Sequence, residues 1–115
     1  MRAHQFGAIG ALMIAGLLLP HRAAGQEVKE RYQNRCSACH GTAGKGDGPV
    51  GKNLTPRPPD FSDAKRMAQV PDAKLTEVII KGAKGMPAYG AMLKPVEVHE
   101  LVGNIRGLSQ KPAPQ

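Results

Sequence analysis

Two cysteines and a histidine lie within one five-residue segment, Cys36-Ser37-Ala38-Cys39-His40. A C-x-x-C-H spacing is typical of covalent haem attachment, because each thiol can add across one vinyl group of the haem and form a thioether. The imidazole that follows can then bind the iron from the same side of the porphyrin. The chain holds no other cysteine. The sequence therefore predicts one haem c, attached through Cys36 and Cys39, with His40 as an axial ligand.

Three other uses of the two cysteines fit the sequence less well. A thioredoxin-type redox pair requires a βαβ context, and no strand-like alternation precedes Cys36. A zinc site requires two further ligands at a suitable spacing, and only His99 follows the motif. A disulfide between Cys36 and Cys39 would close a tight ring and would leave His40 without a role.

A methionine in the second half of the chain offers a ligand for the other side of the iron. Met86 precedes Pro87, and a residue before proline is pushed towards extended backbone, so Met86 is expected to project from a loop. A thioether is a soft ligand that suits haem iron, and His/Met ligation raises the reduction potential. Methionine is more commonly a core filler. Met67 and Met92 fit that use better, and Met92 is the second candidate ligand.

The first 25 residues are predicted to be a signal peptide. A short basic start precedes an apolar run over residues 6–19, and the small residues Ala23 and Gly25 place a signal-peptidase cut before Gln26. The apolar run is short for a bilayer span. We therefore expect a periplasmic, exported product with no membrane span in the mature chain; a retained anchor is the less favoured alternative.

The rest of the chain is predicted to be one small domain over residues 26–108, followed by a flexible tail over residues 109–115. Its aromatic residues are Tyr32, Phe61 and Tyr89. A small domain with so few large side chains usually needs a staple or a cofactor. A covalently held haem would supply the missing apolar mass.

The charge of the chain points to acidic partners. The formal net charge is +7, from 16 Lys and Arg against 9 Asp and Glu, and removal of a signal peptide that carries two arginines would leave +5. Nucleic acid is disfavoured as a partner by export and by the lack of a run of basic residues. Acidic redox proteins are the expected partners, steered by lysines in loops: Lys45, Lys52, Lys84 and Lys94.

Segments with helical periodicity are predicted on both sides of each candidate ligand, His40 and Met86. Apolar stripes and helix-ending glycines predict one helix from Gln26 to Cys39, a short helix within residues 60–69, one from Asp72 to about Lys81, and one over residues 95–108. No segment has the alternation of a strand, so the fold class is all-α.

A long loop rich in glycine and proline, from Gly41 to Pro59, separates the first two helices. We expect it to wrap one edge of the haem, with Leu54 in apolar contact. A ligating histidine nearly always donates its other ring N–H to a partner. A proline carbonyl of this loop is expected to accept the Nδ1 proton of His40, with Pro49 as the first candidate and Pro56 as the second.

Over essentially all of residues 26–108, the chain resembles the class I c-type cytochromes, in particular small bacterial periplasmic monohaem cytochromes c. The shared features are a helix ending in C-S-A-C-H-G, a G-D-G-P loop at residues 46–49, and an amphipathic C-terminal helix. Residues 86–89, M-P-A-Y, match the M-P-A-[FY] segment that carries the axial methionine in that family. The resemblance implies the cytochrome c fold, three to four helices wrapped around one covalently attached haem.

For the site, the resemblance implies that Cys36 and Cys39 carry the haem, that His40 and Met86 bind the iron, and that Tyr89 lies against the cofactor. One feature departs from the family. A glycine eight residues before the first cysteine commonly pairs with an aromatic on the C-terminal helix, and here these positions are Val28 and Asn104. The departure concerns the crossing of the two helices and leaves the haem motif unchanged.

The expected function is one-electron transfer by a monomer, not catalysis, because an iron ligated on both sides has no open position for a substrate. Two alternatives stay open. The first is a ligand-binding or sensory haem c protein with an open or labile sixth position, and the second is the electron-transfer subunit of a larger oxidoreductase complex. A non-haem metal or redox module is a third, less favoured alternative.

Overall fold

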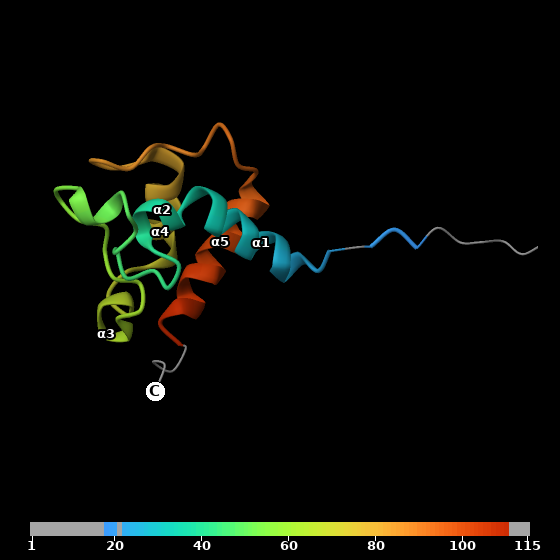
Figure 1. Cartoon of the computed structure of the whole chain (residues 1–115), viewed down its shortest axis with the longest axis horizontal. Coiled ribbons are helices and arrows are strands. Elements are labelled where there is room, and N and C mark those ends of the chain that lie inside the picture. The colour runs from blue at the N-terminus through green and yellow to red at the C-terminus, as the bar shows by residue number, and fades with distance from the viewer. Residues whose placement is uncertain (1–17, 21, 111–115) are drawn as a thin grey trace, which may run out of the picture.

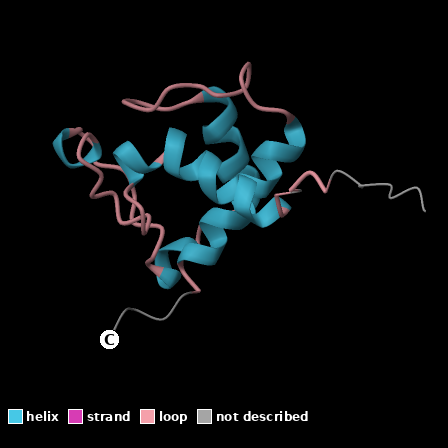
Figure 2. Cartoon of the chain, turned by 45° about the vertical axis from the view of Figure 1, so that its right-hand side comes forward, coloured by secondary structure: helices cyan, strands magenta, loops and turns pink. Residues whose placement is uncertain are grey.

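The structure is a computed structural model that describes residues 18–20 and 22–110. The predicted signal peptide falls largely, and the end of the predicted tail wholly, outside these residues. The described part is helical, with three longer helices and three short helical segments between them (Figures 1 and 2): α1 (Ala24–Arg35), α2 (Ser37–His40), η1 (Gly51–Asn53, a 3-10 turn), α3 (Ala64–Met67), α4 (Asp72–Lys81) and α5 (Pro95–Leu108). The only β-type pairing among the described residues is an isolated bridge between Ala83 and Met86. The all-α prediction is confirmed.

The single helix predicted from Gln26 to Cys39 is instead two segments. α1 begins at Ala24 and ends at Arg35, and α2 begins at Ser37, with Cys36 between them at φ −116°. The hydroxyl of Ser37 donates to the Gln33 carbonyl at 2.6 Å. Such side-chain bonds compete with helical backbone pairing and bend helices. Because of this break, Cys36 follows the last residue of α1, and Cys39 lies in α2.

The two later helices follow the prediction closely. α5 begins at Pro95, where proline suits the first turn. α4 ends at Lys81 and is followed by Gly82, whose φ of 75° favours glycine. Asp72 lies in the first turn of α4, and its carboxylate accepts from Arg106 at 2.7 Å. None of the helices among residues 18–20 and 22–110 is both long and apolar enough to cross a bilayer.

α5 forms the spine of the domain, since both α1 and α4 pack against it (Figure 1). Tyr32 from α1 and Leu101 from α5 are the most deeply buried large side chains, at 1 % exposed each. Val28 packs against the same cluster, at the position where the resembled family commonly has glycine. The buried residues form one core: Tyr32, Phe61, Met67, Ile79, Leu93, Val98, Leu101, Val102 and Ile105.

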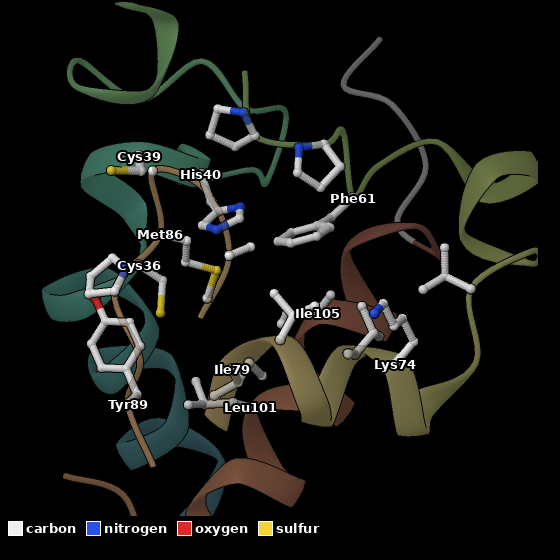
Figure 3. Close-up of a pocket in the computed structure, with 18 of the residues that line it drawn as sticks. Cys36, Cys39, His40, Phe61, Lys74, Ile79, Met86, Tyr89, Leu101 and Ile105 are labelled. Carbon is white, nitrogen blue, oxygen red and sulfur yellow. The ribbon is translucent and has the colours of Figure 1, made fainter. Parts of the chain in front are cut away.

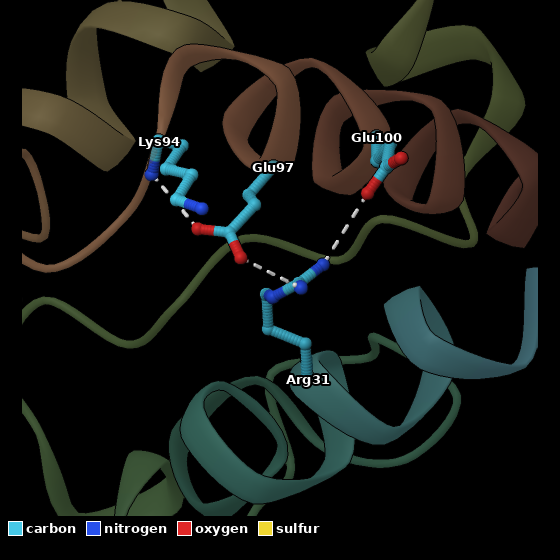
Figure 4. Close-up of polar contacts among 4 residues, drawn as sticks. All are labelled: Arg31, Lys94, Glu97 and Glu100. Carbon is cyan, nitrogen blue, oxygen red and sulfur yellow. Dashed lines mark hydrogen bonds and ion pairs between the residues drawn. The ribbon is translucent and has the colours of Figure 1, made fainter. Parts of the chain in front are cut away.

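One arginine ties the first and last helices together at their crossing (Figure 4). The guanidinium of Arg31 on α1 donates to Glu97 at 2.9 Å and to Glu100 at 3.3 Å, both on α5. Glu97 also accepts from the backbone N–H of Lys94 at 2.8 Å, which caps the start of α5. This backbone hydrogen bond, followed by Arg31, holds the pKa of Glu97 below its ordinary value.

The lowered pKa of Glu97 predicts how stability depends on pH. A carboxylate with a depressed folded pKa stabilises the protein above its unfolded pKa, and this contribution disappears as the pH falls through the folded pKa. We therefore expect Glu97→Gln to be less stable than wild type at neutral pH, and the gap to close between about pH 5 and about pH 3. Urea denaturation followed by circular dichroism measures it, with Glu77→Gln, an exposed carboxylate on α4, as the control. A gap that stays constant with pH would contradict the assignment.

Candidate haem site

The end of α2 is covered by the loop that follows it. The backbone N–H groups of Gly46, Gly48 and Val50 donate to the carbonyls of His40, Cys39 and Ala38, at 2.8, 3.2 and 2.9 Å. The last carbonyls of a helix have no partner within it. The loop therefore satisfies the helix end that carries Cys39 and His40, and fixes the direction in which their side chains leave the backbone.

Two glycines make this cover possible because the loop lies directly on the backbone of α2. A Cβ at Gly48 would collide with the carbonyls of Ser37 and Ala38, and a Cβ at Gly51 would collide with the carbonyl of Cys39. Glycine is the residue that allows such close backbone approach. The G-D-G-P segment noted in the sequence thus contacts the C-x-x-C-H motif itself.

The imidazole of His40 stacks on an aromatic ring from the far end of the loop. The rings of His40 and Phe61 have centroids 4.7 Å apart and planes 13° apart. Burial lowers the pKa of His40, which favours the neutral form that can bind a metal. Its Nδ1 is buried and has no hydrogen-bond partner among the described residues.

Met86 lies in a tight turn that is fixed at both ends. Ala83 and Met86 exchange two backbone hydrogen bonds of 3.1 and 2.9 Å, and Gly82 and Gly85 have φ near +75° and +79°. The N–H of Tyr89 then donates to the carbonyl of Ile79 at 2.9 Å, which attaches the turn to α4. Met86 thus projects from a loop, as its place before proline predicted.

Tyr89 ties the same loop to the haem motif. Its hydroxyl donates to the carbonyl of Arg35 at 3.1 Å, at the end of α1 and one residue before Cys36. Burial raises the pKa of this hydroxyl, so it remains a donor at neutral pH. The loop that carries Met86 is therefore linked to both α4 and α1.

Cys36, Cys39, His40 and Met86 line one cavity of about 300 Å³ (Figure 3). Tyr89 and Leu54 line it as well, as predicted for cofactor contacts. The cavity is bounded by side chains of the buried core, and its floor comes from α4 and α5. Within this floor, Figure 3 labels Ile79, Leu101 and Ile105.

Two candidates do not come into the cavity. Pro49 is not among its lining residues, and its carbonyl accepts from the Asn53 side chain at 3.3 Å instead. Gly48 and Gly51 let this stretch lie directly on the backbone of α2, whereas Pro56 lines the cavity. Neither proline carbonyl accepts from His40, because its Nδ1 has no hydrogen-bond partner among the described residues. Met92, the second candidate ligand, is 54 % exposed and lies outside the lining.

Several side chains that shape the site could not be identified from the sequence. Phe61 follows a loop without periodicity, and nothing local marks it as the partner of His40. The hydroxyl of Tyr32 donates to the carbonyl of Gly41 at 2.8 Å, which buttresses the end of α2, and burial raises its pKa. The sequence did offer one indication of the role of Tyr32, because this residue lies four positions before Cys36 on the same face of a predicted helix. Three cationic lining residues were also missed: Arg57, Arg66 and Lys74.

The lining fits an apolar, anionic, covalently attached group such as haem c. Both cysteines are free thiols at intermediate exposure, and burial raises the pKa of the Cys36 thiol. Five of the lining residues are Lys or Arg and none is Asp or Glu. Among the described residues, no three His, Cys, Asp or Glu side chains are grouped closely enough to hold a metal ion.

The hydrogen bond of Tyr89 generates a prediction about loop stability. Tyr89→Phe removes only the hydroxyl, and an intramolecular hydrogen bond contributes about 0.5–1.5 kcal/mol. We expect the amides of Met86 and Tyr89 to exchange with solvent about two- to tenfold faster, since the loop would open more often. Hydrogen exchange measured by NMR on the haem-loaded protein tests this, with the amide of Val102 in α5 as the internal control. Unchanged exchange at Met86 would show that the bond does not hold the loop.

Comparison with known proteins identifies the family of the chain. Residues 23–103 match the family model described as "Cytochrome C oxidase, cbb3-type, subunit III". Among solved structures, the chain is similar to the KustC0563 c-type cytochrome, with 30% sequence identity and a TM-score of 0.59 over 70% of this chain and 94% of that chain. No curated protein sequence matches. The chain thus belongs to the c-type cytochromes, electron-transfer proteins with covalently bound haem c, as a cytochrome c domain of the cbb3 subunit III type.

Proposed function

We propose that the chain is a one-electron carrier whose haem iron is ligated by His40 and Met86. The observation that supports this most is that Met86 projects into the cavity that Cys36, Cys39 and His40 line (Figure 3). The haem supplies the redox chemistry of its iron. The chain attaches it through two thiols, keeps it in an apolar enclosure and offers an imidazole and a thioether, a pair that favours a high potential.

The rigid turn around Met86 supports a stable sixth ligand rather than a labile one. Backbone bonds to α4 and the Tyr89 hydroxyl bond to α1 restrict the movement of the loop. A sensory or ligand-binding haem protein would need that position to open. We therefore place electron transfer ahead of ligand binding.

Met86→Ala tests the sixth ligand directly. In oxidised wild-type protein we expect the charge-transfer band of a Met–iron bond, and slow or absent binding of CO to the reduced form at neutral pH. The variant should lose the band and bind CO readily, because its sixth position is open. Met92→Ala is the matched control and should behave as wild type. A wild-type protein that lacks the band or binds CO readily would refute His/Met ligation.

We further propose that acidic redox partners dock where the cavity meets the surface. Lys84 and Arg35 line the cavity at its Met86 and Cys36 side, and Lys84 is exposed. Of the four loop lysines considered from the sequence, only Lys84 lines the cavity. A positive field near a redox centre raises the encounter rate with anionic partners.

Small redox reagents of opposite charge test this field. Lys84→Glu should slow oxidation of the reduced protein by anionic ferricyanide at least about threefold at low ionic strength, and should speed oxidation by a cationic cobalt(III) complex. Both changes should shrink at high salt because charges are screened. Lys45→Glu, the same charge change away from the cavity, is the control. Equal responses of the two variants would remove the proposed steering.

The apolar run over residues 6–19 supports export to the periplasm, with a mature chain that begins at Gln26. Cleavage there would remove only the first two residues of α1, Ala24 and Gly25. The mass of the exported protein tests the cleavage site.

The description of the family model favours a second candidate function, electron transfer within a larger oxidoreductase complex. Recovery of the chain as a free monomer from its host would exclude it, whereas stable co-purification with an oxidase would support it.

A further inference from the structure

The cations that line the cavity fall into two groups along the chain. Arg35 directly precedes Cys36, and Lys84 lies two residues before Met86. Arg57, Arg66 and Lys74 come from the loop before α3, from α3 and from the first turns of α4. Figure 3 shows Lys74 directed into the cavity on the side away from Cys36 and Tyr89.

The positions of the substituents on haem c fix how the haem is oriented in the cavity. Its two thioethers lie on two pyrrole rings, and its two propionate carboxylates lie on the rings across the macrocycle. Attachment through Cys36 and Cys39 therefore directs the carboxylates away from the cysteines, towards the side where Figure 3 shows Lys74. Arg57 and Arg66 line the same cavity. We infer that these three side chains form the binding site for the haem carboxylates. This inference rests on the proposed haem site.

These three cations have few competing partners within the described chain and can therefore bind haem carboxylates. Among the described residues, neither the Arg57 nor the Arg66 guanidinium forms an ion pair. Lys74 pairs with Glu77 at 3.3 Å, but both side chains are about half exposed, and such a pair contributes little. A partly enclosed carboxylate is a stronger partner for cations than an exposed glutamate.

The acidic residues of the same region are engaged elsewhere. Asp63 accepts from the backbone N–H of Arg66, Asp72 from the Arg106 side chain, and Asp60 from Ser62. None of them lines the cavity. Apart from the exposed Glu77 that pairs with Lys74, no carboxylate of the described chain pairs with these cations, and none lines the cavity.

The wall between the cations is rigidly held. Arg106 on α5 donates to the carbonyls of Met67, at 2.6 Å, and Val70, and to the carboxylate of Asp72. It thereby fixes the turn that joins α3 to α4, with Arg66 on one side and Lys74 on the other. A fixed spacing between two donors lowers the entropy cost of binding two carboxylates.

The haem-loaded protein tests the inference through the pH dependence of its midpoint potential. Cations that hold the propionates ionised make the wild-type potential nearly flat between about pH 5 and about pH 8. In Arg57→Gln, Arg66→Gln and Lys74→Gln we expect at least about a tenfold gain in the proton affinity of a propionate. The potential should then fall with rising pH inside that window.

Two matched controls separate this effect from charge loss alone. Lys65→Gln lies beside Arg66 on α3, and Lys81→Gln shares Glu77 with Lys74 on α4; neither lysine lines the cavity. Each control can lower the potential, but by the same amount at every pH. The propionate bending mode in the resonance Raman spectrum should shift in the three variants and not in the controls.

The outcomes separate this inference from the proposed function. Profiles and Raman modes that are equal in variants and controls, in a protein with a normal His/Met spectrum, overturn the carboxylate site alone. A wild-type protein without that spectrum overturns the proposed ligation instead. If a glutamine variant fails to take up haem, Arg57→Lys, which keeps the charge, should retain the wild-type profile.

Discussion

The proposed haem contacts depend on the backbone hydrogen bonds that join α2 to the loop behind it. The loop pairs the carbonyls of Ala38, Cys39 and His40, which the helix itself cannot satisfy. Because Cys39 and His40 lie in this one turn, the same hydrogen bonds fix the directions of both the thiol and the imidazole. The glycines of the loop serve close contact at Gly48 and Gly51, where any side chain would push the loop off the helix.

Local sequence patterns were enough to predict the features that local physics decides. The apolar stripe, the early proline and the polar end of α5 gave bounds of Pro95–Leu108, which the structure matches. The C-x-x-C-H spacing located Cys36 and His40 on one side of a cavity. A proline after Met86 was sufficient to take this residue out of a helix, and the resemblance to class I cytochromes gave the direction of the second ligand.

Features that depend on long-range packing could not be predicted from the sequence. Phe61 stacks on His40 only because Gly44 allows the loop to fold back, and no periodicity links the two. The break at Cys36 results from a single serine hydroxyl that competes with the backbone. Pro49 and then Pro56 were expected to accept a hydrogen bond from the imidazole, but only Pro56 lines the cavity and the Nδ1 of His40 has no partner among the described residues. Each outcome depends on where a glycine-rich loop turns.

The contacts of Arg106 bear on the order in which the domain is assembled. Chains are made from the N-terminus, so the thiols of Cys36 and Cys39 are present long before Arg106, which secures the turn between α3 and α4. Until α5 docks, the turn between α3 and α4 lacks the hydrogen bonds that Arg106 donates to it. The docking of the last helix therefore completes this wall of the cavity.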